Sequence, residues 1–495
     1  MKRKIRVFAF IMALMMLLGT MAACSSGGGG GSTTTQGNEN PPAAATEPDN
    51  SNSGETPKTE EKDTITALLP PVTLEFQDRF EEIQKEFNKL YPNLTLKLEP
   101  ASWDDMTQKL DTQVNAGNPP DLAFISSAAI AKYVQQGMLM DISDAATPEM
   151  FEDFDKAPLD YMRNGDGIYG FPAYMEVHAI GGNKKFMEDA GIDYKTVQKN
   201  GWTYEEFREA IKKGVVKDGN KTSRYGFVFA TAGAATAKDY LSILAKNAGM
   251  PAAFDENLKF AYTSKNYLVL LKAIREMIDD GSMPKELSSI DAGKRWNMFL
   301  TGQTMITGKG LATFENLANK NNEKIKANDG SAVKDSIEVE YIVLPVPTFA
   351  GQKLQASTVV DGYVTFRGKK EPTPEHKANV VKAAYFLASG KIAALTNNDI
   401  FAAHITKSAK EAAASMETNR NPDNVAAVEF MLANATPARP DIPTDLGAKA
   451  IKIEDEVIVP KFQALLANEI TPEQMYDAVK EAAVKAFGED GIVKD

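Results

Sequence analysis

The sequence predicts an α/β fold with two lobes, and three observations support this prediction. Short apolar runs alternate along the chain with segments of helical period. The folded body, expected from Asp63 to Asp495, is too long for one comfortable hydrophobic core. Cap residues at several predicted helix ends punctuate the pattern.

The first part of the body has the βαβαβ rhythm of a parallel sheet. Three short apolar or alternating runs are predicted as strands: 64–69, 94–98 and 121–125. The segment after the first strand has apolar residues every three or four positions: Phe76, Phe80, Ile83, Phe87 and Leu90. This spacing predicts an amphipathic helix that ends before Pro92, and a second helix is expected over 105–115.

Later helices are marked by their ends. The stretches 203–206 and 471–474 are capping boxes, in which a threonine precedes a Glu or Gln by three residues. Helices over 264–280 and 374–389 are each followed by glycine, a common residue after a helix. The polar stretch 319–336 is predicted to be a loop.

The N-terminus predicts export and a lipid anchor. Basic residues at positions 2–6 precede twelve apolar residues, 7–18, which are too few to span a bilayer. Met21-Ala-Ala-Cys24 resembles a bacterial lipobox, which predicts a signal peptide over 1–23 and diacylglycerol on Cys24. Residues 24–62 are rich in Gly, Ser, Thr, Asn and Pro, so they are predicted to be a disordered tether.

Charge and cysteine content exclude several functions. Residues 1–23 carry four basic and no acidic side chains, so their removal takes the formal net charge from −12 to −16. An acidic exported protein is a poor partner for nucleic acid or for anionic lipid surfaces. Because Cys24 is the single cysteine and is assigned to lipid, no thiol is left for a disulfide, zinc or catalysis.

No catalytic or metal motif stands out. The chain has three histidines, and Glu176 and His178 point to one face of a strand without a visible third metal ligand. Gly308-Lys-Gly310 lacks the spacing of a phosphate-binding loop. We therefore expect a protein that is not an enzyme and that holds no cofactor or metal. A glycoside hydrolase needs only two carboxylates, so it is kept as an alternative function, together with a lectin-like lipoprotein.

Several segments, in order, carry a family resemblance. They include "FEEIQKEFNKLYPNLTLKLEP", "WDDMTQKLDTQVNAGNPPDLAFI", "GIYGFPAYMEVHAIGGNKKFMEDAGID" and "YIVLPVPTFAGQ". This order resembles the extracellular solute-binding proteins of ABC importers, the family that includes maltodextrin-binding proteins. The resemblance implies a periplasmic-binding-protein-like fold, with two α/β lobes joined by hinge strands around a ligand cleft.

The resemblance also implies lobe boundaries and partners. The N-terminal lobe is expected over 63–172 and 355–390, and the C-terminal lobe over 173–354 and 391–495. The protein is expected to be a monomeric receptor that captures a small solute and delivers it to ABC permease subunits. It would contact the outer face of the cytoplasmic membrane only through its lipid.

Candidate ligand-binding residues come from the resemblance and from strand ends. Glu176 falls where the family has a ligand-binding glutamate beyond the hinge. The other candidates follow from topology, because ligands of open α/β folds lie beyond the carboxyl ends of strands. They are Glu75, Ser126, Ser127, Tyr174, Lys309, Asp361 and Tyr363. Arg439 is added because its stretch "PARPDIP" resembles a family loop that reaches the cleft.

The ligand class is left between two alternatives. Family membership favours a carbohydrate, with Phe76, Tyr174, Phe314 or Tyr363 as possible stacking rings. Trp103 and Trp202 are interpreted as core, and Trp296 as packing. The positions of maltodextrin platforms lack aromatic residues here, and Glu75, Glu176 and Asp361 would make an acidic-to-neutral pocket. A small nitrogenous or cationic solute is therefore the alternative.

Overall fold

The structure of the protein is a computed structural model that describes residues 62–73 and 76–494. These residues belong to one compact unit that begins at Glu60. Cys24, Glu75, the expected signal peptide and residues 24–61 lie outside the described residues, so the predictions made there stay predictions.

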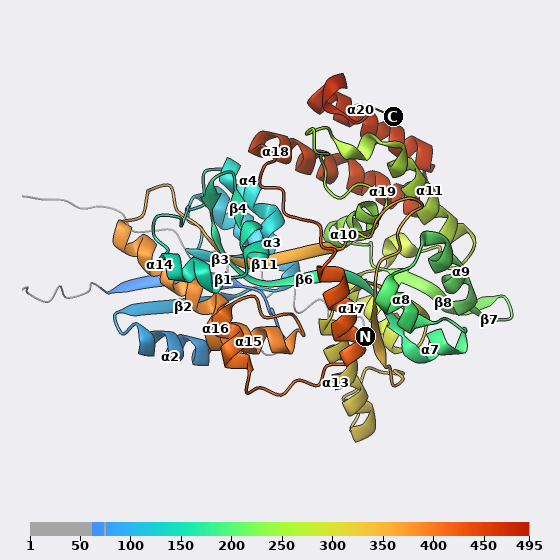
Figure 1. Ribbon diagram of the computed structural model, residues 1–495, viewed down its shortest axis with the longest axis horizontal. Helices are drawn as coiled ribbons and strands as arrows, with labels where there is room; N and C mark the ends of the chain where they lie inside the picture. The colour runs from blue at the N-terminus through green and yellow to red at the C-terminus, as the bar shows by residue number, and fades with distance from the viewer. Residues whose placement is uncertain (1–61, 74–75, 495) are drawn as a thin grey trace, which may run out of the picture. The chain divides into compact units, whose positions relative to one another are not determined.

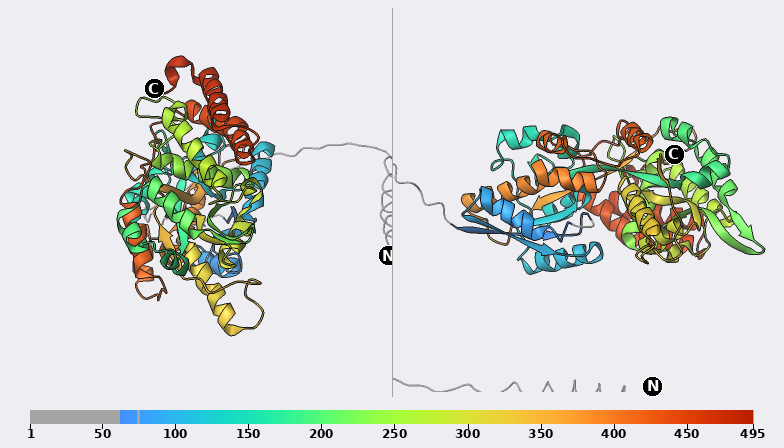
Figure 2. Two further views of the ribbon diagram at one scale, coloured as in Figure 1. Left: turned by 90° about the vertical axis from the view of Figure 1, so that its right-hand side faces the viewer. Right: turned by 90° about the horizontal axis from the view of Figure 1, so that it is seen from below.

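The N-terminal lobe is built on the predicted βαβαβ unit (Figure 1). Strand β1 (Asp63–Leu69) lies between β2 (Leu94–Pro100) and β3 (Leu122–Ser126), and it is parallel to both. The helix α2 (Phe80–Leu90) packs on one face of this sheet and α3 (Trp103–Ala116) on the other (Figure 2). The α/β prediction is therefore confirmed for this part of the chain.

One long strand connects the two lobes. Strand β6 (Gly170–Asn183) is buried along its whole length. Its first part pairs with β11 (Ser357–Thr365), and its last part pairs with β9 (Thr304–Gly310) and β10 (Tyr341–Leu344). The strand order is β2-β1-β3-β11-β6-β9-β8-β7, where β8 is Lys221–Phe229 and β7 is Val216–Asp218. A small separate hairpin joins β4 (Arg163–Asn164) to β5 (Gly167–Ile168).

Each lobe has its own hydrophobic core. One core joins β1, β2 and β3 to α14 (Pro374–Ala388), and Phe87 of α2 contacts Phe386 of α14 at 5.3 Å between ring centres. The other core joins β8 and β9 to α9 (Tyr204–Gly214) and α11 (Lys265–Asp279). The two-lobed architecture expected from length and pattern is confirmed.

The lobe boundary after α14 differs from the expectation. Ile392, Ile400 and Ile405 pack in the core of the N-terminal lobe, although residues from 391 onward were expected in the C-terminal lobe. They belong to α15 (Gly390–Asp399) and the loop before α16 (Lys407–Ala413). The reason is physical: α15 follows α14 after a single break, so its apolar face meets the core that α14 already covers.

The remaining helices complete the two lobes. The predicted capping boxes are present at the starts of α9 and α20 (Pro472–Phe487). The predicted loop 319–336 is wrong in its first half, because α13 (Thr313–Ala327) is helical there. The other α-helices are α4 (Ile130–Gln135), α5 (Pro148–Asp153), α6 (Lys156–Asp160), α7 (Lys184–Asp189), α8 (Tyr194–Asn200), α10 (Ala234–Asn247), α12 (Ala292–Leu300), α17 (Pro422–Leu432), α18 (Thr444–Ile453) and α19 (Val459–Leu466).

Short helical turns lie between these elements. They are 3-10 turns at η1 (Ser127–Ala129), η2 (Ala261–Thr263), η3 (Leu287–Ser289) and η5 (Glu489–Gly491), and a π-helical turn at η4 (Glu454–Ile458). Within the described ranges, no helix is both long and apolar enough to cross a membrane.

The three tryptophans have different environments. Trp202 is buried and donates its indole N–H to the carbonyl of Pro345 at 2.8 Å, which confirms its assignment to the core. Trp296 stacks on Phe299 and Phe314, as packing predicted. Trp103 is 49% exposed, so its assignment to the core is wrong. It begins α3, where its ring meets Phe124 in a T-shaped contact and its indole N–H donates to the carbonyl of Pro71 at 3.0 Å.

Candidate functional site

A cavity of about 460 Å³ lies between the two lobes, and we call it the cleft. The N-terminal lobe contributes Ser126, Ser127 and Ile130, and the C-terminal lobe contributes Asp239, Ser242, Lys246 and Tyr262. The edge of β11 from Ser357 to Val360 forms part of the wall, since β3 pairs with β11 only from Asp361 onward. The cleft therefore meets strand ends of both lobes, as ligand sites of open α/β folds do.

Local structure explains why these side chains meet. Strand β3 ends at Ser126, whose hydroxyl accepts a hydrogen bond from the backbone of Ala128 at 3.4 Å and begins the turn into α4. On α10, Asp239, Ser242 and Lys246 are spaced by three and four residues, so they share one face of the helix. All three line the cleft.

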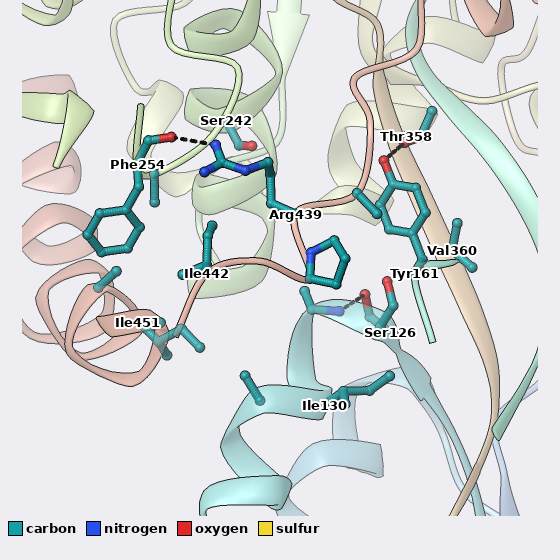
Figure 3. Close-up of a pocket in the computed structure, with 18 of the residues that line it drawn as sticks. Ser126, Ile130, Tyr161, Ser242, Phe254, Thr358, Val360, Arg439, Ile442 and Ile451 are labelled. Carbon is teal, nitrogen blue, oxygen red and sulfur yellow. Dashed lines mark hydrogen bonds between the residues drawn. The ribbon is translucent and has the colours of Figure 1, made fainter. Parts of the chain in front are cut away.

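A segment that we call the strap, residues 436–443, crosses this region. Arg439 holds it to the C-terminal lobe, because its guanidinium donates to the carbonyls of Phe254 at 3.0 Å and Asp255 at 3.2 Å. Figure 3 shows Phe254 and Ile451 on the left of the view, with Ile442 of the strap beside them, and Tyr161, Thr358 and Val360 on the right. Arg439 thus lines the cleft and also fixes one of its walls.

The lobes also touch at the mouth of the cleft. The helix α18, which follows the strap, packs against α4 of the N-terminal lobe. The hydroxyl of Thr444 donates to the side-chain oxygen of Asn164 at 2.8 Å. A solute in the cleft would therefore be enclosed from both lobes.

The charges along the cleft balance. Its acidic residues are Asp160, Asp239 and Glu454, and its basic residues are Arg163, Lys246 and Arg439. Burial raises the pKa of Glu454, and the ammonium of Lys238 at 3.1 Å opposes this change. Burial lowers the pKa of Lys246 to about 8, and its ammonium donates to the carbonyl of Pro251 at 2.7 Å. The lining as a whole favours neither a cation nor an anion.

His178 lines the cleft and carries a buried hydrogen-bonding atom that is unpaired within the part of the chain that the structure describes. Its side chain is 7% exposed and lines the cavity from β6, opposite Ser357 of β11. Burial, with Lys309 and Lys246 nearby, holds the pKa of His178 well below its usual range, so the ring is neutral. Its Nε2 has no hydrogen-bond partner among the described residues. A buried polar atom of this kind is costly unless a ligand pairs with it.

Two partly exposed tyrosines complete the lining. Tyr262 stacks on Tyr267 with ring centres 5.3 Å apart. Tyr161 donates its hydroxyl to the carbonyl of Thr436 and shares a hydrogen bond with Thr358 at 2.9 Å. Aromatic rings beside hydrogen-bonding groups suit a ligand with an apolar face and a polar edge.

The structure brings only part of the predicted set to the cleft. Ser126, Ser127 and Arg439 line it, whereas the other described candidates are absent from its lining: Tyr174, Glu176, Lys309, Asp361 and Tyr363. Glu75 lies outside the described residues. Tyr363 is 1% exposed and packs on Phe124 in the core of the N-terminal lobe.

The other four form a buried polar group that we call the hinge cluster. Tyr174 donates its hydroxyl to Asp361 at 2.6 Å, and Lys309 donates to Asp239 at 2.9 Å. Burial raises the pKa of Glu176 to about 7, although Lys309 and the backbone at the start of α13 oppose this change. One carboxylate oxygen of Glu176 and one of Asp361 have no hydrogen-bond partner among the described residues. The hinge cluster therefore differs from the cleft because it does not line the cavity, and not because it is fully paired.

Sequence reasoning did not select Tyr161, Asp239, Lys246 or Tyr262 as ligand contacts. The three-and-four spacing on α10, directly after a buried strand, was the signal for Asp239 and Lys246. Tyr161 and Tyr262 carry no such signal, because tertiary packing alone brings them to the cleft. Over the part of the chain that the structure describes, no three His, Cys, Asp or Glu side chains gather in a group that could hold a metal ion.

Comparison with known proteins identifies the class. The model of the bacterial extracellular solute-binding protein family matches residues 73–389, which is more than half of the chain. The chain belongs to this family.

Relatives agree with this assignment. A protein of Brucella abortus (strain 2308), named for binding with no ligand given, is 33% identical over 113 residues, which are 23% of this chain and 28% of that protein. An arabinooligosaccharide-binding protein of Halalkalibacterium halodurans is 27% identical over 147 residues, 29% of this chain and 32% of that protein. These matches span about a third or less of each relative's length.

Solved structures extend the likeness to most of the chain. An ABC substrate-binding protein of Listeria monocytogenes in complex with cycloalternan aligns with a TM-score of 0.67 and 19% identity. The alignment covers 86% of this chain and 100% of that one. This identity supports the fold, and the periplasmic-binding-protein-like architecture expected from the sequence is confirmed.

Proposed function

We propose that the protein is a receptor that encloses a carbohydrate in the cleft and delivers it, chemically unchanged, to the permease of an ABC importer. It acts as a monomer held to the outer face of the cytoplasmic membrane by lipid on Cys24. Membership of the solute-binding family supports the receptor role. The arabinooligosaccharide and cycloalternan ligands of two similar proteins support the solute class.

The neutral imidazole of His178 is the observation that carries the solute class. A sugar hydroxyl both donates and accepts, so it can pair with the open Nε2 in either tautomer. The balanced charges of the cleft add no preference for an ion, and the rings of Tyr161 and Tyr262 offer faces for a pyranose or furanose.

A small cationic solute is less well supported by this geometry. The carboxylates that suggested it, those of Glu176 and Asp361, lie in the hinge cluster and are absent from the lining of the cleft. Lys246 and Arg439 line the cleft on the C-terminal side. A glycoside hydrolase or a lectin would bind the same class of molecule, so the experiment must also follow the fate of the sugar and the motion of the lobes.

The test is a calorimetric titration of the mature chain with panels of neutral oligosaccharides, amines and peptides. We expect neutral sugars to bind. We expect His178→Phe to lower the affinity for the sugar about tenfold, because a hydroxyl of the sugar loses its buried hydrogen-bond partner. His178→Gln is the matched control, since an amide of similar length restores a hydrogen bond. Mass spectrometry should recover the sugar intact, and X-ray scattering should show contraction on binding.

Three outcomes would contradict the proposal. If amines or peptides bind and sugars do not, the solute is not a carbohydrate. Cleavage of the bound sugar would favour the hydrolase, and binding without contraction would favour a lectin.

A further inference from the structure

A second cavity of about 510 Å³ lies beside the cleft. The two cavities share four wall residues, Asp160, Tyr161, Ala438 and Pro440. The second cavity continues along α6 and the loop before α16, away from the residues of α4 and α10 that line the cleft. Its volume falls within the range of small-molecule sites.

The lining of the second cavity is mainly apolar. Alanine, proline, leucine, isoleucine and methionine side chains make up most of it, among them Ala157, Met175 and Leu432. Its two carboxylates already have partners, because Asp155 pairs with Lys410 at 2.9 Å and Asp160 pairs with Arg163 at 3.5 Å. An ionic ligand would therefore find no free countercharge among these groups.

Two buried polar atoms on lining residues lack partners among the described residues. Thr436 is 4% exposed, and its hydroxyl has no hydrogen bond. The Nδ1 of His404 is also buried and unpaired. Burial lowers the pKa of His404, and Arg420 and Lys410 act in the same direction, so its ring is neutral. A ligand with one hydroxyl group could satisfy either atom, which would remove an uncompensated desolvation cost.

We propose that this second cavity is a distinct binding site for a small, neutral, largely apolar molecule that carries a hydroxyl group. Nothing in its lining requires charge, and its two unpaired polar atoms are a hydroxyl and a neutral imidazole. The site is separate from the cleft in its chemistry, because the cleft is lined by six charged side chains that belong to both lobes.

Occupancy of the second cavity is coupled to the cleft through their common wall. The carbonyl of Thr436 accepts the hydroxyl of Tyr161, and Tyr161 also bonds to Thr358 in the wall of the cleft. The backbone N–H of Thr436 donates to Ala356 at 3.0 Å, next to the start of β11. A molecule packed against Thr436 therefore contacts the same wall that a solute in the cleft meets.

We expect the coupling to be positive, because a molecule packed against Thr436 restricts the motion of the common wall. A solute that binds to an already ordered wall has less conformational entropy to lose, so the coupling is positive. It is also reciprocal, since each ligand must change the affinity of the other by the same factor. This part of the inference rests on the proposed function, whereas binding to the second cavity alone does not.

The experiment uses phenol as the probe, on the mature full chain. Ligand-observed NMR and calorimetry should show saturable binding of one phenol molecule. Ala157→Trp places a large side chain on the exposed rim of the second cavity and should abolish this binding. Ala433→Trp is the matched control, because Ala433 is exposed at the end of α17 and lines neither cavity. Thr436→Val should lower the affinity for phenol about fivefold, because the substitution removes the threonine hydroxyl.

Saturating phenol should also tighten binding of the cleft sugar about fivefold in the wild type and leave it unchanged in Ala157→Trp. Absence of phenol binding, or equal binding in Ala157→Trp, would overturn the second site. Phenol binding without any effect on the sugar would overturn the coupling alone. If no sugar in the panel binds, the proposed function is wrong, whereas phenol binding would still support the second site.

Discussion

Two groups of polar side chains gather where the strands of the lobes end, and only one of them borders open space. The hinge cluster (Tyr174, Glu176, Lys309 and Asp361) is buried except for the half-buried Lys309, and none of its members lines the cleft. The cleft lining around His178 and Asp239 borders a cavity of about 460 Å³. Both groups satisfy the topological rule for ligand sites. The difference teaches that strand ends mark the zone of a site, while packing decides which part of that zone stays hollow.

The largest expected effect concerns Tyr363, a predicted ligand contact that packing has placed in the core. Tyr363→Ala should lower the free energy of unfolding by about 3–5 kcal/mol, because it leaves a cavity beside Phe124 in the core. Urea denaturation followed by circular dichroism measures this change. Tyr363→Phe, which keeps the ring, should stay within about 1.5 kcal/mol of the wild type. A near-neutral Tyr363→Ala would contradict the core assignment.

The second prediction concerns the pH dependence that the hinge cluster imposes. The pKa of Glu176 is raised from 4.5 to about 7 by burial in the folded state. The folded chain therefore holds a proton that the unfolded chain releases between about pH 4.5 and pH 7, so the free energy of unfolding falls across that window. Glu176→Gln cannot ionise, and relative to it the wild type should lose up to about 3 kcal/mol between pH 5 and pH 8.

Denaturation at each pH tests this prediction with a matched control. Glu205→Gln replaces an exposed glutamate in the first turn of α9 and should leave the pH profile of the wild type unchanged. Parallel profiles for the wild type and Glu176→Gln would contradict the assignment of the proton to Glu176.

The smallest expected effect lies in the cleft, where a substitution should change affinity more than stability. Tyr262→Leu keeps an apolar contact with Tyr267 but removes a ring face from the lining. We expect the affinity for the sugar to fall about tenfold, which corresponds to the loss of an aromatic contact worth roughly 1.4 kcal/mol. Calorimetry with a thermal melt of the unbound protein separates the two quantities. An unchanged affinity would remove Tyr262 from the site.

Much of the fold could be predicted because its elements are locally encoded. The apolar spacing of α2, the strands β1 to β3 and the capping boxes at Thr203 and Thr471 are visible in short windows of sequence. The second half of α13, from residue 319 onward, was missed because its polar residues hide the helical period. The packing of α15 on the N-terminal lobe was missed because chain order alone does not show which core a helix joins.

The site was less predictable for a physical reason. Ser126 was found from topology, since strand ends surround a cleft, and Arg439 was found because its loop resembles one of the family. Tyr161 and Tyr262 come from elements with no distinctive pattern, so only their packing against Thr358 and Tyr267 reveals them. Glu176 was selected by resemblance, and the structure places it in the hinge cluster, where a ligand role for it remains a prediction.

The position of β11 has a consequence for the order in which this protein can fold. It lies between β3 and β6 in the sheet, yet it is the last of the described strands in the chain. While the polypeptide emerges from its N-terminal end, β3 and β6 each keep an unpaired edge until β11 arrives, and such edges invite pairing with other chains. Contacts this distant in sequence also slow folding. The N-terminal lobe therefore starts first and finishes late, after every other strand of the sheet has been made.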